Sequence, residues 1–239
     1  MKNNLNIGIL LTDHVLENLQ KKHGDQGDFY INLFKNLDPS IEIEIYDVVK
    51  GEYPDSEEDC SGYIITGSRL SIYDDESWIK NLEEYIRLLH KKQKKLLGIC
   101  FGHQLIAQAL GGESGDAAEG WTVGVQQYNF VTQFPWVKTN NPSIALIHSH
   151  RDQVKILPRS AKLVAGNKQV PIAMYYIDNH IMSMQGHPEF TSQYALDVAS
   201  SRKEILGRSL FQLAKKSLLE DTTDNMEVAQ WWINFFKQN

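Results

Sequence analysis

The chain has 239 residues, a formal net charge of −6 and a pI near 5.7. This length is sufficient for one sizeable α/β domain. The acidic balance argues against a nucleic acid or an anionic membrane as the general partner. With only two cysteines, a disulfide framework is not expected, and a reducing cytoplasmic location is favoured. We find no apolar run long enough to span a bilayer, and no signal peptide at the polar start, residues 1–4.

The first half of the chain alternates apolar runs with amphipathic segments. Such alternation predicts a mostly parallel sheet with helices on both faces, and ligands of such sheets bind at the C-terminal ends of the strands. The helix at 78–89 has Asp74, Asp75 and Ser77 as candidate N-caps. The helix after residue 102 is expected to end at the glycine pair 111–112. The expected strands are 5–11, 41–45, 63–66 and 96–99, and the expected helices are 27–37, 78–89 and 103–110.

The second half reads as shorter strands joined by turns, which predicts a smaller antiparallel or mixed part of the sheet. From residue 191 the pattern is helical again, and apolar side chains recur there at helical spacing. Either the chain's own core or a partner must cover this stripe. We expect one α/β domain over 1–200, with a helical extension over 201–239 packed on it. The strands are expected at 121–131, 144–147, 163–166, 171–177 and 180–184, and the stripe is Val228, Trp231, Trp232, Phe235 and Phe236.

The segment Leu-Gly-Ile-Cys-Phe-Gly-His-Gln, residues 97–104, places Cys100 between Gly98 and Gly102, after a strand and before a helix. This is the arrangement of a nucleophile elbow, with Cys in place of Ser. The glycines suit a strained turn that leaves no room for neighbouring Cβ atoms. The helix N-terminus behind the thiol favours the thiolate, which is the reactive form. The N–H of Phe101 is a candidate donor to an oxyanion.

A second motif, Gln-Gly-His-Pro-Glu at residues 185–189, follows far downstream. His187 offers a general base, and Glu189 offers a carboxylate that could orient it. Cys100, His187 and Glu189 together have the chemistry of a nucleophilic triad. The sequence therefore predicts covalent catalysis on a carbonyl carbon.

The pair of motifs, Gly-Ile-Cys-x-Gly-x-Gln followed by Gly-His-Pro-Glu, resembles the class I glutamine amidotransferase, or triad glutaminase, family over about residues 5–192. The segment 71–78, Ser-x-Tyr-Asp-Asp-x-x-x-Trp, is similar to the stand-alone, GMP-synthase-like branch. The resemblance implies hydrolysis of a γ-glutamyl amide, glutamine to glutamate and ammonia, through a Cys100 thioester. It implies no metal and no organic cofactor.

The resemblance also assigns further residues. Gly67 would supply the second oxyanion N–H, although this chain has Thr-Gly-Ser where many members show Gly-Gly-Pro or Ser-Gly-Gly. Gln104 lies one helical turn after the nucleophile and would bind the amino-acid end of the substrate. Ser149 and His150 match the segment whose backbone helps to hold glutamine, and Asp152 begins a recurring family turn.

Three roles stay open on the sequence. The chain could be a glutaminase subunit that delivers ammonia to a separate synthetase, or a free-standing γ-glutamyl peptidase. No phosphate-binding loop of the Gly-x4-Gly-Lys type occurs, and a homodimer is compatible with either role. The rival from another class is a metallohydrolase, because His148, His150 and Asp152 form an H-x-H-x-D pattern.

Overall fold

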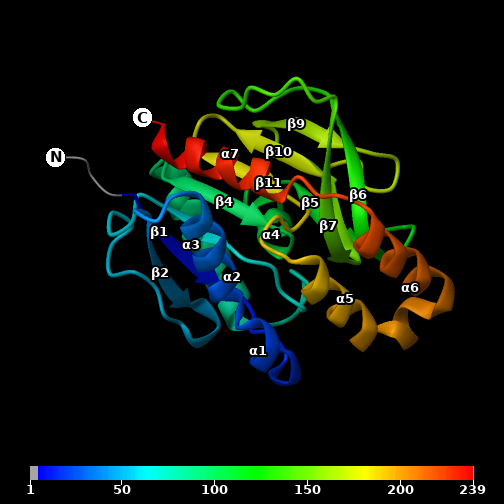
Figure 1. Cartoon of the computed structure of the whole chain (residues 1–239). Helices are drawn as coiled ribbons and strands as arrows, with labels where there is room; N and C mark the ends of the chain where they lie inside the picture. Colours follow the sequence, from blue (N-terminus) through cyan, green and yellow to red (C-terminus); the bar gives the residue numbers. More distant parts are fainter. Residues whose placement is uncertain (1–4, 239) are drawn as a thin grey trace.

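The computed structural model describes residues 5–238, whose centre is a nine-stranded sheet of order β2-β1-β3-β4-β11-β10-β9-β6-β7 (Figure 1). Five neighbouring strands are parallel, and each coincides with a strand expected from the sequence. The polar start, residues 1–4, lies outside the described part. The parallel strands are β1 (Asn6–Leu11), β2 (Glu42–Asp47), β3 (Gly62–Ile65), β4 (Lys95–Ile99) and β11 (Ile181–Met184).

The other part of the sheet is antiparallel, which confirms the expected mixed α/β fold. A separate two-stranded ribbon of β5 and β8, which the apolar pattern did not predict, lies beside it. The antiparallel strands are β6 (Thr122–Phe130), β7 (Ser143–His150), β9 (Ala161–Gly166) and β10 (Met174–Ile177), and the ribbon strands are β5 (Glu113–Asp116) and β8 (Asp152–Ile156).

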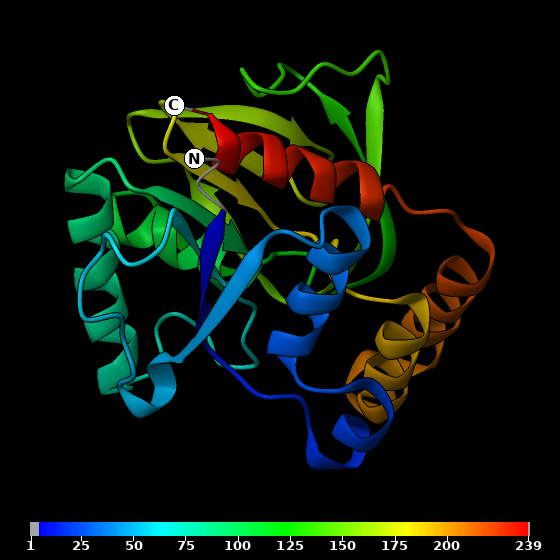
Figure 2. The ribbon, with the colours of Figure 1, turned by 60° about the vertical axis from the view of Figure 1, so that its left-hand side comes forward.

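Helices cover both faces of the parallel strands because side chains alternate along each strand. Ile7 and Ile9 of β1 point into a core shared with α2 and α7, whereas Leu10 points into a core shared with α3 and α4. Figure 2 shows α2 and α7 side by side on their face. These helices are α2 (Gln26–Leu37), α7 (Asn225–Lys237), α3 (Ser77–Lys91) and α4 (Phe101–Ala109); the short α1 (Glu17–His23) precedes α2, and a 3-10 turn (Val48–Lys50) follows β2.

The C-terminal aromatic stripe lies inside the molecule. Trp232 is fully buried, with its ring 6.2 Å from that of Tyr30 and 6.1 Å from that of Phe34, both on α2. Phe235 is also fully buried and lies 4.8 Å from Trp136. Helix α7 therefore closes one face of the sheet, while the boundary expected at residue 200 stays a prediction.

Helices α5 (Ser192–Ser201) and α6 (Lys203–Glu220) pack beside β6 and β7 (Figure 1). Arg202 separates the two helices, with φ −103° and ψ 10°. Gly207 has φ 73°, which breaks α6 into two differently directed parts. No helix within residues 5–238 is long and apolar enough to cross a membrane.

The expected N-caps of α3 were wrong. The helix starts after Glu76, which makes no side-chain capping bond, and Ser77 is already its first residue. The carboxylate of Asp74 instead accepts from the Ser71 N–H, and Asp75 pairs with Lys80. Polar residues in a turn can satisfy nearby groups other than the helix end, so a cap cannot be read from composition alone.

The parallel strands bring four loops to one edge of the sheet. Ile65 of β3 pairs with Gly98 of β4, and Ile99 pairs with Met184 of β11. The chain segments that follow β1, β3, β4 and β11 therefore leave the sheet together. This common edge carries both sequence motifs.

Replacing Trp232 with alanine should lower the free energy of unfolding by about 3–5 kcal/mol, because a buried indole is removed. Gln230→Ala, at an exposed position of the same helix, is the matched control and should change it by about 0.5 kcal/mol or less. Urea denaturation measures both. Equal effects of the two substitutions would contradict a core role for α7.

Candidate active site

Cys100 occupies a strained turn between β4 and α4. Its φ of 50° and ψ of −98° lie where non-glycine residues rarely sit. The turn is held by two backbone bonds, from Cys100 N–H to the Met184 carbonyl (3.0 Å) and from Gln104 N–H to the Cys100 carbonyl (3.1 Å). A Cβ on Gly102 would lie 2.5 Å from the Ile65 carbonyl oxygen, so glycine is required for this approach. The elbow geometry expected from the sequence is present.

His187 follows the end of β11, lies beside Cys100 and is buried. Its Nδ1 lies 2.6 Å from Oε1 of Glu189, and its ring stacks on Phe190 with centroids 4.0 Å apart. Burial acts to lower the pKa of His187, but the Glu189 carboxylate and the neighbouring Cys100 raise it to about 10. A positively charged imidazolium is therefore held next to the sulfur.

The loop after β3 passes over the Cys100–His187 pair. A Cβ on Gly67 would lie 2.9 Å from Cε1 of His187 and 3.6 Å from Cβ of Cys100. The Thr66 carbonyl accepts from Gly102 N–H (3.2 Å) and from the Thr12 hydroxyl (3.2 Å). Because a trans peptide directs C=O and N–H oppositely, these bonds fix the direction of the Gly67 N–H. Phe101, the other proposed donor, opens α4, where helix N–H groups lack intrahelical partners.

The three residues expected to bind substrate, Gln104, Ser149 and His150, all lie near Cys100 but make different contacts. The amide nitrogen of buried Gln104 donates to the Asp152 carbonyl (2.7 Å) and to Oε1 of Gln185 (3.1 Å), so it ties α4 to β8 and to the segment that follows β11. The Ser149 hydroxyl accepts from Arg202. His150 is buried and neutral, because burial lowers its pKa to about 3, and its Nδ1 lies 2.9 Å from the Asp152 carbonyl.

The H-x-H-x-D pattern does not gather into a metal site. His148 lies against the hydroxyl of Tyr128, with Nε2 at 2.7 Å, and the Asp152 carboxylate accepts from Ser71 at 2.6 Å. No group of three metal-ligating side chains exists among residues 5–238. The metallohydrolase alternative therefore has no structural support.

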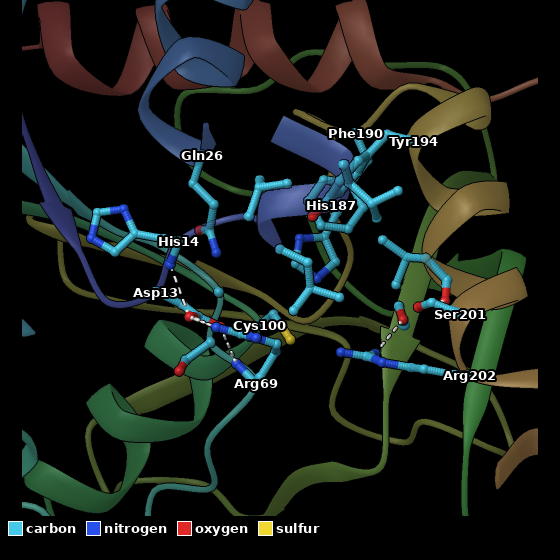
Figure 3. Close-up of a pocket in the computed structure, with 17 residues that line it drawn as sticks. Asp13, His14, Gln26, Arg69, Cys100, His187, Phe190, Tyr194, Ser201 and Arg202 are labelled. Atoms are coloured by element: carbon cyan, nitrogen blue, oxygen red, sulfur yellow. Dashed lines mark hydrogen bonds and ion pairs between the residues drawn. The ribbon is translucent and has the colours of Figure 1, made fainter. Parts of the chain in front are cut away.

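An apolar cavity of about 210 Å³ opens on one side of Cys100 (Figure 3). Its walls are formed by the loop after β1, helix α1, the start of α2 and helix α5, and His187, Cys100 and Gly67 lie at its base. Arg69 and Arg202 enter it from opposite sides, as Figure 3 shows. Its apolar side chains are Val15, Leu16, Leu19, Phe190, Tyr194 and Val198, and its polar ones, besides the base, are Asp13, His14, Gln26, Ser68, Arg69, Ser149, Ser201 and Arg202.

A second, polar cavity of about 200 Å³ also borders Cys100 and shares Ser149 and Arg202 with the first. Its most acidic feature is the pair Asp116 and Asp152, which the Tyr73 hydroxyl bridges at 3.2 Å to each. Burial raises the pKa of Asp152, and a hydrogen bond with Asp152 lowers the pKa of Asp116. The polar lining consists of Ser68, Arg69, Ser71, Tyr73, Gln104, Asp116, Ser149, His150, Arg151, Asp152 and Arg202.

Several site residues carried no signal in the sequence. Arg202 follows a serine pair in a helical region and belongs to no motif. Tyr30 reads as a core residue of α2, yet its pKa is raised by burial and by the nearby Glu189 charge, which places it beside that carboxylate. Asp13 lies just after β1, so its place at the common edge could have drawn attention to it.

Comparison with known proteins gives one consistent family. Residues 14–199 match the family model described as glutamine amidotransferase class I. Gamma-glutamyl peptidase 2 of Arabidopsis thaliana is 28% identical over 219 residues, covering 87% of this chain and 88% of the relative. Gamma-glutamyl peptidase 4 of the same plant is 34% identical over 180 residues, covering 71% of each chain.

Solved structures agree on the fold. A glutamine amidotransferase from Thermotoga maritima superposes with a TM-score of 0.76 at 19% identity, covering 98% of this chain and 99% of that one. A putative GMP synthase subunit from Thermoplasma acidophilum gives a TM-score of 0.61 at 18% identity, covering 86% of this chain and 98% of that one. At these identities the likeness establishes the fold alone.

The pairing of Cys100 with a charged His187 should be visible as thiol reactivity. At pH 7, iodoacetamide should alkylate Cys100 much faster than Cys60, a buried thiol whose pKa burial raises. His187→Ala should slow alkylation of Cys100 by about tenfold or more, because the neighbouring positive charge is lost, and should leave Cys60 unaffected. Peptide mass mapping separates the two sites; equal rates at both cysteines would contradict the pairing.

Proposed function

The chain belongs to the class I glutamine amidotransferase family, and on that premise we propose that it hydrolyses γ-glutamyl amide bonds through a thioester on Cys100. The observation that carries the proposal is the strained elbow cysteine beside an imidazolium that a buried carboxylate orients. A cysteine in this position is both activated and presented to a carbonyl carbon.

In the first half-reaction the Cys100 sulfur attacks the γ-carbonyl carbon, and a C–S bond forms. The negative charge that develops on the oxygen is stabilised by the N–H groups of Gly67 and Phe101. His187 then gives its proton to the nitrogen as the C–N bond breaks, and the amine leaves. The γ-glutamyl group remains on the sulfur as a thioester.

In the second half-reaction neutral His187 takes a proton from water, and the resulting hydroxide attacks the thioester carbon. The C–O bond forms, the C–S bond breaks, and glutamate is released. The thiolate and the imidazolium are then restored. Glu189 keeps the imidazole in one orientation and stabilises its charged form, while the stacked Phe190 fixes the ring plane.

The polar cavity suits the γ-glutamyl half of the substrate. Its acidic pair, Asp116 and Asp152, can receive the α-ammonium group. Ser149 and His150 border the same cavity. Gln104 contributes by holding β8, and hence Asp152, against α4.

A free-standing hydrolase in the cytoplasm, without metal or organic cofactor, is the form of the enzyme that we favour. The relatives named gamma-glutamyl peptidases, which this chain covers over 71% and 88% of their length, support it. A role as the ammonia-supplying subunit of a synthetase would instead require a partner chain. Activity of the purified chain alone on γ-glutamyl peptides separates the two roles.

Cys100→Ala should lower hydrolysis of glutamine and γ-glutamyl peptides by about 10⁴-fold or more, because the nucleophile is removed. Cys60→Ala, the control, should stay near the wild-type rate, since Cys60 lies in the opposite core among Tyr46 and Tyr63. Release of glutamate measures both. Cleavage that survives in Cys100→Ala would overturn the proposal.

Glu189→Gln should lower kcat/KM by about 10²- to 10⁴-fold. The decline of kcat/KM at alkaline pH should also begin at a lower pH than in the wild type. Because the pKa of His187 is raised to about 10, the imidazolium persists through neutral pH and is lost as the pH rises through that value. Without the Glu189 charge this loss should occur at lower pH.

The control is Glu220→Gln, which removes an exposed carboxylate of α6. A Glu189→Gln enzyme with the wild-type alkaline limb would show that Glu189 does not stabilise the charged form of His187.

A further inference from the structure

The two cavities at Cys100 divide the substrate into two halves, if the proposed function holds. Cys100 borders both cavities, whereas His187 borders the apolar one and is absent from the lining of the polar one. His187 must reach the departing nitrogen to protonate it. The amine half of the substrate therefore leaves through the apolar cavity.

The apolar cavity is larger and less polar than ammonia requires. Leu16, Leu19 and Val198 contribute aliphatic surface, and Phe190 and Tyr194 contribute aromatic surface in edge contact, with ring centroids 4.7 Å apart. A cavity volume of about 210 Å³ exceeds the space of one water-sized molecule several times. Walls of this kind bind an apolar side chain of the amine half.

Arg202 is the arginine of this cavity that forms no ion pair with a carboxylate of the described residues. No carboxylate pairs with it among residues 5–238; its guanidinium donates to the Ser149 hydroxyl (3.0 Å) and lies 5.3 Å from the Trp121 ring. Arg69, by contrast, is already bound through two nitrogens to Asp13, at 2.7 Å each. Desolvation lowers the pKa of half-buried Arg202, while the nearby Cys100, Tyr194 and Asp13 act in the opposite direction and offset this cost only in part.

The position of Arg202 selects which carboxylate it can bind. It borders both cavities and points toward Cys100 in Figure 3, so it stands where the two halves of the substrate meet. In an α-amino acid joined through its nitrogen, the carboxylate carbon lies only two bonds, about 2.5 Å, from that nitrogen. Such a carboxylate lies where the two cavities meet, within reach of Arg202.

We propose that the apolar cavity and Arg202 form a leaving-group site for an apolar α-amino acid with a free carboxylate. The preferred substrate class is then γ-glutamyl dipeptides whose second residue is apolar. Arg202 binds the carboxylate, and the walls formed by α5 and the loop after β1 bind the side chain.

The test uses the full chain and three substrates: γ-glutamyl-leucine, γ-glutamyl-glycine, and γ-glutamyl-isopentylamide, which keeps the leucine side chain but lacks the carboxylate. The wild type should have a kcat/KM for γ-glutamyl-leucine about 10- to 100-fold above each of the others. A wild type that cleaves glutamine and the three substrates equally well would overturn the leaving-group site and leave the proposed hydrolase intact. A wild type that cleaves none of them in a Cys100-dependent way would overturn both.

Arg202→Met should remove most of the preference for γ-glutamyl-leucine over the isopentylamide, because only γ-glutamyl-leucine carries the carboxylate that Arg202 binds. Arg208→Met, an exposed arginine of α6, is the matched control and should keep the wild-type preference. An Arg202→Met enzyme that loses the same factor on every substrate would place Arg202 on the γ-glutamyl half and overturn the assignment.

Leu19→Asn tests the apolar wall separately. It should lower the preference for γ-glutamyl-leucine over γ-glutamyl-glycine by about tenfold, whereas Leu213→Asn, at a position of α6 that is 66% exposed, should keep it. An unchanged preference in Leu19→Asn, together with an unchanged one in Arg202→Met, would contradict the site as a whole.

Discussion

The close backbone packing around Cys100 is the constraint on which the rest of the site depends. Gly98 and Gly102 let β4 and α4 approach each other and the end of β3 so closely that any Cβ would collide with backbone atoms. This packing holds Cys100 in a conformation with positive φ, where it borders both cavities. Because β11 is the parallel neighbour of β4, the same edge receives His187, and the loop after β3 brings Gly67 over both. The sheet thus positions every proposed catalytic group.

The charge arrangement follows from this packing. An imidazolium between a buried carboxylate and a sulfur is stable only because both neighbours offset the cost of burial. The same edge carries a polar cavity with an acidic pair and an apolar cavity with an arginine that forms no ion pair with a carboxylate of the described residues. A substrate with an ammonium group at one end and an apolar amino acid at the other complements both sides. With the proposed leaving-group site, the two cavities suit cleavage between two unlike halves better than release of ammonia alone.

The features predicted from the sequence are those that a local pattern of residues encodes. The elbow glycines around Cys100 and the Gly-His-Pro-Glu motif identified the family, and apolar runs located the parallel strands and α7. What could not be predicted depends on tertiary placement. Arg202 reaches the site from the break between α5 and α6, and Tyr30 of α2 lies near Glu189 only through tertiary packing. Strands β5 and β8 lack a clear apolar run, so only their pairing with each other defines them.

The most direct test of the account is to trap the covalent intermediate. Wild-type protein mixed with γ-glutamyl-leucine, quenched in acid within the first turnovers and digested, should carry one γ-glutamyl group on the peptide that contains Cys100, and none in the Cys100→Ala variant. Product formation without such an adduct, or an adduct on Cys60, would contradict a thioester mechanism at the elbow.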